Sequence, residues 1–204
     1  MKYNFPYWGP FVCKLQVEQE MVDILLEKGK ESREKNLDHR SKLAGMIDNE
    51  YYYEDYGEWI VPKFTPYIHA YIEGLQTSWE VVIKPIKECI TTSLWLNYQK
   101  AKEYNPPHHH EGDLSFVIYL QVPDEIKKEN EKMQGVQNNA GPGCINFNYG
   151  VELPFSISDF HKLPEVGDLF IFPAWLTHHV FDFKSDVERI SVSGNIIFKG
   201  KDNV

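Results

Sequence analysis

Apolar positions follow a helical period near the start of the chain. Val17, Met21 and Leu25 stand at i, i+4 and i+8, and Ile24 falls beside them at i+7. This spacing predicts an amphipathic helix with one apolar face. The charged run at 27–40 either continues that helix or forms a solvated loop, and the pattern does not decide between the two.

A second helix is predicted further along the chain. The segment 49–59 is acidic and aromatic and is expected to be irregular. Thr65 is then followed by Pro66, an order typical of a helix start, because threonine caps free N–H groups and proline fits the first turn. The apolar face predicted for this helix consists of Ile68, Tyr71, Ile72, Leu75 and Trp79.

Past residue 85 the pattern changes to short β-branched and aromatic runs separated by Pro, Gly, Asn and Asp. The runs cover 91–98, 115–122, 144–149, 168–172, 179–183 and 189–198. The polar stretch 123–143 is expected to be a long loop. Because no helix-length pattern separates the late strands, the sequence favours an antiparallel jelly roll over βαβ units.

The predicted fold class is therefore α+β, mainly β, with N-terminal helices packed on a jelly-roll barrel. The length of 204 residues suits one domain, and 42% hydrophobic residues is a normal globular content. We expect a single domain over 1–204, with a helical part at 1–89 and a barrel core at 90–198.

Charge and cysteine content narrow the function classes. Lys and Arg number 21 and Asp and Glu number 30, so the net charge is −9, which argues against general nucleic-acid binding. Cys13, Cys89 and Cys144 are odd in number and widely spaced, which fits neither a disulfide framework nor a zinc ribbon. No signal peptide or membrane-spanning run is expected, so we predict a cytoplasmic protein of undetermined oligomeric state.

Five of the eight histidines occupy two short clusters, each beside a predicted strand. In the first cluster, His108 and His110 point the same way on an extended backbone, as do His109 and Glu111, and Gly112 prevents the strand phase from deciding between these pairs. The second cluster contains His178 and His179. Consecutive histidines in a loop are often merely solvated, but two clusters at strand ends favour a metal site.

The last predicted strand adds a candidate anion site. Arg189, Ser191, Ser193 and Asn195 alternate with mostly apolar residues, so they share one face. Such a polar face is usually a solvated surface. An arginine fork beside a hydroxyl also suits a carboxylate held inside a barrel.

Taken together, these blocks resemble the Fe(II)- and 2-oxoglutarate-dependent dioxygenases, in particular a small group of oxygenases common in phages and bacteria. The resemblance covers about residues 90–198 and rests on the order of the blocks. The blocks are Trp95-Leu-Asn97, His108-His-His110, the strand Leu114 to Leu120 with Tyr119, Phe172-Pro-Ala-Trp-Leu-Thr-His178-His-Val180, and Arg189-Ile-Ser191.

The resemblance implies a double-stranded β-helix, a cupin-like jelly-roll barrel, that holds Fe(II) and uses 2-oxoglutarate and molecular oxygen. It implies His108 and His178 as the catalytic metal ligands, with His178 preferred over His179. Arg189 would bind the distal carboxylate of 2-oxoglutarate, assisted by Ser191 and Tyr119, with Asn97 a weaker candidate. The expected reaction hydroxylates a C–H bond of a peptidyl or small-molecule substrate and releases succinate and carbon dioxide. If the gene is carried by a phage, the host cytoplasm is the expected location.

The sequence departs from the wider superfamily at the position of the usual carboxylate ligand, which is His110. Either the third ligand is His110, which we prefer, or Glu111 or Asp113 supplies the negative charge. Two other functions also fit the same architecture. One is a cupin-like metal enzyme of the isomerase type, and the other is a non-enzymatic jelly-roll binding module.

Overall fold

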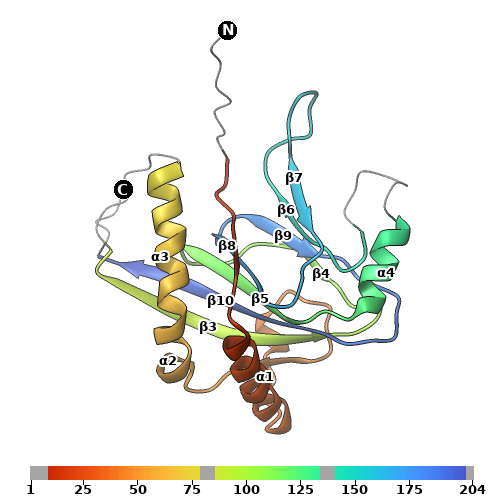
Figure 1. Ribbon diagram of the computed structural model, residues 1–204, viewed down its shortest axis with the longest axis horizontal. Helices are drawn as coiled ribbons and strands as arrows, with labels where there is room; N and C mark the ends of the chain where they lie inside the picture. The colour runs from red at the N-terminus through yellow and green to blue at the C-terminus, as the bar shows by residue number, and fades with distance from the viewer. Residues whose placement is uncertain (1–8, 79–85, 134–140, 201–204) are drawn as a thin grey trace.

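The computed structural model describes residues 9–78, 86–133 and 141–200 (Figure 1). In chain order its elements are β1 (Cys13–Gln16), α1 (Gln19–Glu34), a 3-10 turn (Arg40–Lys42), β2 (Glu50–Tyr52), α2 (Tyr56–Trp59), α3 (Val61–Ser78), β3 (Glu88–Gln99), β4 (Asn105–His108), β5 (Leu114–Gln121), α4 (Asp124–Met133), β6 (Ile145–Asn148), β7 (Asp159–Lys162), β8 (Asp168–Pro173), β9 (Thr177–Val180) and β10 (Arg189–Lys199). The mainly β prediction is confirmed.

The strands form two antiparallel sheets. The larger sheet has the order β1-β8-β5-β10-β3-β2, and the smaller has the order β4-β9-β6-β7. Sequence neighbours are often not sheet neighbours, and strands of both sheets line one pocket between them. This is a double-stranded β-helix, as predicted.

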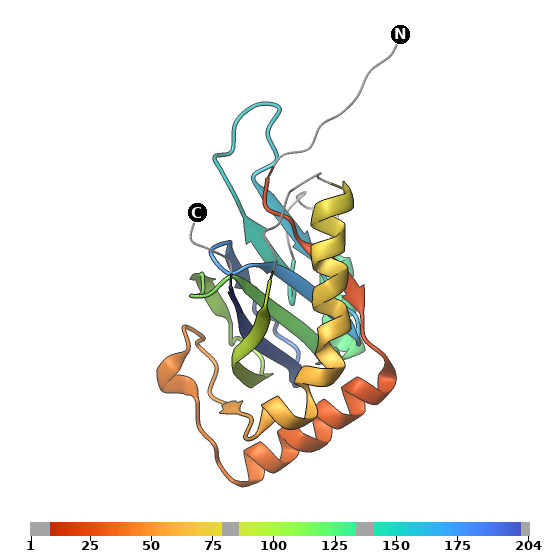
Figure 2. The same ribbon diagram turned by 90° about the vertical axis from the view of Figure 1, so that its left-hand side faces the viewer.

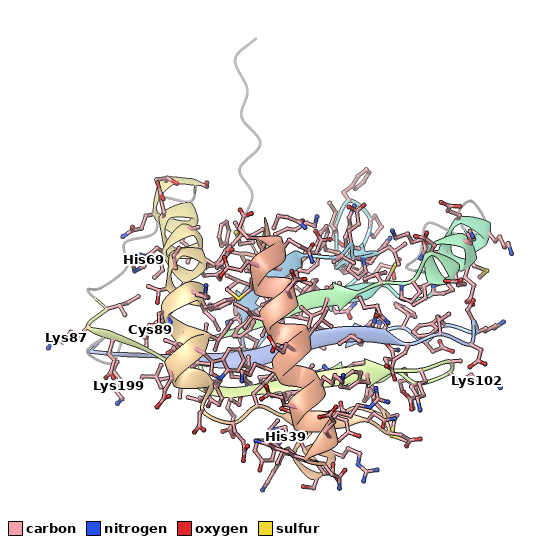
Figure 3. All side chains as sticks on the ribbon, turned by 60° about the horizontal axis from the view of Figure 1, so that its bottom comes forward. His39, His69, Lys87, Cys89, Lys102 and Lys199 are labelled. Atoms are coloured by element: carbon pink, nitrogen blue, oxygen red, sulfur yellow. The ribbon has the colours of Figure 1, made fainter. Side chains whose placement is uncertain are left out.

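Strand alternation gives the large sheet a different core on each face. Figures 2 and 3 show α1 and α3 covering one face of this sheet. Leu94, Leu96, Ile118 and Val192 belong to the core that includes buried residues of these helices. The opposite face carries a second core, with Val117, Tyr119, Ile145, Phe147, Phe170 and Phe172 among its members. The helices therefore close one side of the sheet, and the other side is left for the pocket.

The first helix agrees with its prediction. Met21 and Leu25 are 5% and 0% exposed, while Val17 precedes the helix and is also buried. The helix continues into the charged run as far as Glu34, which settles the alternative left open by the pattern.

The second long helix begins earlier than predicted. Thr65 does not cap it, because α3 starts at Val61 and contains Pro66 in its interior. Phe64 extends the apolar face one turn upstream, where it is buried with Ile68 and Tyr71. Pro66 is exposed, so solvent can hydrate the backbone carbonyl that its missing N–H leaves free. Trp79 lies outside the described residues.

Two segments predicted to lack regular structure contain some. The segment 49–59 holds β2 and α2, elements of three and four residues that are too short to show a period. The stretch 123–143 holds α4, which was missed because its buried face has only Ile126 and Asn130, spaced i, i+4. The prediction of loops was wrong at both places.

The strand predictions were right in position and differ at the ends. The run expected at 179–183 is β9, which starts at Thr177. Strands β1, β4 and β7 were not predicted, since each is only four residues long and contains no β-branched residue. The N-terminal part expected to be helical also supplies β1 and β2 to the large sheet.

None of the helices in the described ranges combines the length and the apolar character that crossing a bilayer requires.

Candidate metal centre and anion pocket

Three histidines from the two sequence clusters meet in the pocket. His108 ends β4 and lies directly opposite His178 of β9, so their side chains share one face. His110 follows two residues later, held by its backbone N–H donating to the carbonyl of Ala174 at 2.8 Å. One ligand atom from each of the three imidazoles lies within 4.8 Å of the others. This is the only such group of potential ligands within the described part of the chain.

The backbone sets the tautomer of two of these rings. Nδ1 of His108 lies 2.7 Å from the carbonyl oxygen of Pro106, and Nδ1 of His178 lies 2.9 Å from that of Leu176. A carbonyl only accepts, so each Nδ1 carries the proton and donates it. Each Nε2 then keeps a free lone pair, the arrangement that backbone-anchored metal ligands use.

Burial keeps all three imidazoles neutral. It lowers the pKa of His110 to about 4, with a further contribution from the neighbouring His108 and His109. Burial also lowers the pKa of His108, and it lowers that of His178 well below its ordinary value. Neutral imidazoles are the form that binds a metal ion, so the donor set fits a divalent cation.

The alternative ligands do not join the cluster. His109 and Glu111 are exposed. Asp113 turns toward the C-terminal end of β10, where its Oδ2 accepts from the backbone N–H of Phe198 at 2.7 Å. His179 packs its ring against Phe181, at 4.8 Å between centroids.

Glycine permits the sharp change of direction that separates His110 from Asp113. Gly112 has a φ of +106°, and a Cβ there would lie 2.9 Å from the carbonyl oxygen of Ile196. A larger residue would be strained and would clash with the backbone. The turn therefore directs Asp113 away from the imidazoles.

A buried guanidinium lies in the same pocket. Arg189 is 3% exposed, and its terminal nitrogens donate to the carbonyl of Gly143 at 2.6 Å and to Oε1 of Gln99. Burial lowers its pKa, although an arginine stays charged in proteins. Its Nε has no hydrogen-bond partner, and no carboxylate pairs with it among the described residues. Such a charge is ready to accept an anion.

The other predicted anion-site residues lie in one row across the sheet. Ser191 of β10 is opposite Asn97 of β3 on one side and Tyr119 of β5 on the other. The Tyr119 hydroxyl is fully buried and has no hydrogen-bond partner among the residues that the structure describes. Burial raises its pKa to about 12, and its ring centroid lies 5.3 Å from the guanidinium carbon of Arg189. All three residues line the pocket.

Sequence reasoning missed two groups that hold Arg189. Gln99 is 1% exposed, and its Nε2 donates to the carbonyls of Glu103 and Phe181 at 2.5 and 3.3 Å, which leaves Oε1 for Arg189. The polar alternation that marks Asn97 continues to Gln99, so that signal was available. Gly143, which has a φ of +74°, contributes only a backbone carbonyl and has no comparable signal.

The histidines outside the two sequence clusters do not join the metal-ligand group. His39 packs beside Tyr52 and Trp95, and His69 lies on α3 (Figure 3). Nδ1 of His161, on β7, lies 3.2 Å from Oδ2 of Asp159. Trp95 lines the pocket, whereas Trp175 is 54% exposed and packs on Tyr149.

Comparison with solved structures shows the same fold. A prolyl-4-hydroxylase from Pseudomonas putida has a TM-score of 0.60 at 12% identity, and 93% of each chain is covered. A viral collagen prolyl hydroxylase from Paramecium bursaria Chlorella virus-1, solved with 2-oxoglutarate, has a TM-score of 0.56 at 12% identity, with 92% of this chain and 96% of that chain covered. The epimerase SnoN of nogalamycin biosynthesis has a TM-score of 0.52 at 14% identity, with 91% and 78% covered.

Sequence comparison identifies the family. A search of curated proteins found no significant match. A family described as "Putative 2OG-Fe(II) oxygenase" matches residues 93–195, which is half of the chain and includes the histidine cluster and Arg189. The chain therefore belongs to the 2-oxoglutarate- and Fe(II)-dependent oxygenase family, whose reaction requires Fe(II), 2-oxoglutarate and molecular oxygen.

Proposed function

We propose that His108, His110 and His178 hold the Fe(II) of this oxygenase. The observation that carries the proposal is the convergence of three buried, neutral imidazoles, two of them with Nε2 left free by backbone anchoring. An imidazole set of this kind suits Fe(II), and its three positions leave the remaining coordination sites for cosubstrates. When bound, the iron would activate oxygen at the expense of 2-oxoglutarate, which leaves as succinate and carbon dioxide.

The ligand set has a consequence for charge. Two histidines and a carboxylate reduce the charge of Fe(II) to one, but three neutral histidines leave both charges in place. Glu111 is exposed and Asp113 is engaged elsewhere, so neither is placed to neutralise the ion. The negative charge of 2-oxoglutarate then has to supply the balance, and metal and cosubstrate should bind cooperatively.

Arg189 is assigned to the distal carboxylate of 2-oxoglutarate. Its guanidinium is buried with neutral partners, so it retains a full charge for an incoming anion. Ser191 and Tyr119 form the neighbouring cross-strand pair on the same face of the sheet, and their hydroxyls would donate to the same carboxylate. Asn97 is one strand further and serves as a weaker contact.

The proposed reaction is hydroxylation of a C–H bond of a peptidyl or small-molecule substrate. The structural neighbours include prolyl hydroxylases, one of them in complex with a peptide fragment, and an epimerase. The product distinguishes hydroxylation from epimerisation, because only hydroxylation adds one oxygen atom to the substrate.

The test is succinate formation by the full chain supplied with Fe(II) and 2-oxoglutarate, followed by calorimetry with redox-silent Mn(II). We expect His178→Ala to abolish turnover and to weaken metal binding by more than the roughly 10–100-fold that loss of an outer partner costs.

His109→Ala is the matched control, because this exposed neighbour removes one imidazole without touching the cluster. It should bind Mn(II) like the unaltered chain. Equal metal affinity in the His178 and His109 variants would refute the ligand assignment, as would the absence of any cosubstrate binding to the loaded protein.

A further inference from the structure

Glu50 is a buried carboxylate without a partner. It lies on β2, is 1% exposed, and neither of its carboxylate oxygens has a hydrogen-bond partner in the described part of the protein. A buried carboxylate is normally paired or fully hydrogen-bonded, since losing water without compensation is costly. The side chain is therefore either neutral or reserved for a group from outside the chain.

The sheet register places Glu50 beside the oxygenase pocket. Glu50 is directly opposite Asn97, so the two side chains share the pocket face, with their Cβ atoms about 5 Å apart. Asn97 lines the pocket, and its Oδ1 is also buried without a partner. Two adjacent side chains thus offer three oxygen acceptors that no donor of the described residues satisfies.

Aromatic rings extend the same face toward the histidines. The next pair on this face of the sheet is Tyr52 with Trp95. The ring of His39 lies 5.9 Å from Tyr52 and 6.2 Å from Trp95, and Trp95 lies 5.6 Å from His110. Aromatic faces attract cations, especially where water is excluded. The acceptors and the rings therefore favour the same kind of occupant.

The charges around Glu50 also disfavour an anion. Burial raises its pKa to about 7, and the carboxylates of Glu103 and Asp38 act in the same direction. Arg40 acts in the opposite direction, but its guanidinium is already paired with Asp38 at 2.8 Å. A cation entering here would restore the ionised form of Glu50 and gain its attraction.

The preceding segment covers the carboxylate closely. A Cβ added at Gly45 would lie 2.6 Å from Oε1 of Glu50, so the backbone packs directly against it. Ile47 from the same segment lines the oxygenase pocket. A ligand would therefore reach Glu50 from the pocket side, past Asn97.

We propose that Glu50 and Asn97, flanked by Tyr52 and Trp95, bind an ammonium or guanidinium group of the primary substrate. This inference rests on the proposed oxygenase function and names a substrate class for it, a cationic molecule or a peptide with a basic side chain. Glu50 is then a specificity residue that holds the substrate at one end while its C–H bond lies near the histidines.

The experiment uses the full chain loaded with Mn(II) and 2-oxoglutarate. The probes are n-butylammonium and n-butylguanidinium, each compared with its neutral counterpart, n-butanol or n-butylurea, by NMR-detected titration. We expect each cation to bind at least roughly 10-fold more tightly than its neutral counterpart, the effect of a hydrogen bond to a charged group. Glu50→Gln should lose this preference, and Glu50→Asp should retain part of it.

Glu111→Gln is the control, because it removes the same unit of charge from an exposed position near the pocket. Its preference for the cations should be unchanged. The inference is overturned if the unaltered chain binds cation and neutral probe equally, or binds neither, or if Glu50→Gln keeps the preference. Succinate release by the unaltered chain, measured separately without probes, reports whether the oxygenase assignment itself holds.

Discussion

Arg189 and Glu50 are two buried charges on one face of the large sheet, and the protein treats them differently. They lie on β10 and β2, on either side of β3, with Cα atoms roughly 12 Å apart by strand spacing. Arg189 has neutral partners in Gly143 and Gln99, whereas the Glu50 carboxylate has none in the described ranges. The positive end of the pocket, at Arg189, is therefore held in position by hydrogen bonds before any ligand binds. The negative end, at Glu50, has no such hydrogen bonds.

Asp168 is a third buried charge, and its partners within the fold give it a structural role. Asp168 is 0% exposed, but Lys14 approaches its Oδ1 at 2.6 Å and the backbone N–H of Glu165 donates to its Oδ2 at 2.9 Å. The pair joins β8 to the edge strand β1. Within the described residues neither Arg189 nor Glu50 has such a counter-charge, which is why we assign both to ligands and not to the fold.

The largest effect is expected at the positive end. Arg189→Met should weaken 2-oxoglutarate binding by at least roughly 30-fold, since truncating one partner of a buried charge pair costs about 2–5 kcal/mol. Mn(II) binding in the absence of 2-oxoglutarate should change little, because the histidines keep their backbone anchors. Calorimetry with each ligand separately measures both quantities.

Arg40→Met is the control for lost positive charge, because Arg40 is exposed and paired with Asp38 outside the pocket. Its 2-oxoglutarate affinity should be unchanged. If the Arg189 and Arg40 variants bind the cosubstrate equally well, the positive end of the pocket is not its site.

At the negative end, Glu50→Gln should stabilise the empty protein. Glu50 ionises in the unfolded chain near its ordinary pKa of 4.5 and in the folded chain at about 7. Between these values the folded state holds the extra proton, so the stability of the natural protein falls as pH rises from 4.5 through 7. Glu50→Gln lacks this pH-dependent loss. Its free energy of unfolding should exceed that of the natural protein by about 2–3 kcal/mol at pH 8, and by little near pH 4.5.

Denaturant unfolding at pH 5 and pH 8 measures this gain. Glu111→Gln should show no comparable pH-dependent difference, since Glu111 is exposed. A destabilised Glu50→Gln protein at pH 8 would mean that the carboxylate has a partner within the fold, and the contrast with Arg189 would fail.

The fold could be predicted largely because the strands that build it have long, regular patterns. Strands β3, β5 and β10 span 12, 8 and 11 residues, long enough for a period of two to be visible. Elements of three or four residues, such as β1 and β2, contain no more than two positions per face. Their existence depends on pairing with distant strands, which a local pattern does not record.

The residues of the site also differ in whether the sequence alone could identify them. The histidines and Arg189 are unusual residues in unusual places, so their types and spacing suggested chemistry before any contact was known. Glu50 has no such signal, because a glutamate in an acidic stretch is ordinarily solvated. Pairing with Asn97 of a distant strand places Glu50 on the pocket face, where it is buried and has no partner among the described residues.

A smaller effect would test why Arg189 has neutral partners. Gln99→Glu would keep an acceptor at Arg189 but give it a negative charge in close contact. The guanidinium would then be neutralised internally, and we expect 2-oxoglutarate affinity to fall about 10-fold, from the loss of one charge-assisted interaction. Gln99→Leu, which removes the contact without adding charge, should lose less. The opposite order would show that Gln99 acts by positioning alone.

The smallest effect is expected at Tyr119, which distinguishes charge from hydrogen bonding at the positive end. Its hydroxyl is buried without a partner, so Tyr119→Phe removes one donor to the bound carboxylate while keeping the ring beside Arg189. The KM for 2-oxoglutarate should rise about 5-fold, since one hydrogen bond contributes about 1 kcal/mol, while kcat stays close to its original value. Because the natural hydroxyl is unsatisfied when the pocket is empty, the variant should also be no less stable than the natural protein in the absence of 2-oxoglutarate. A stability loss without any change in KM would instead place this hydroxyl in the packing of the sheet, and the positive end would then consist of Arg189 and Ser191 alone.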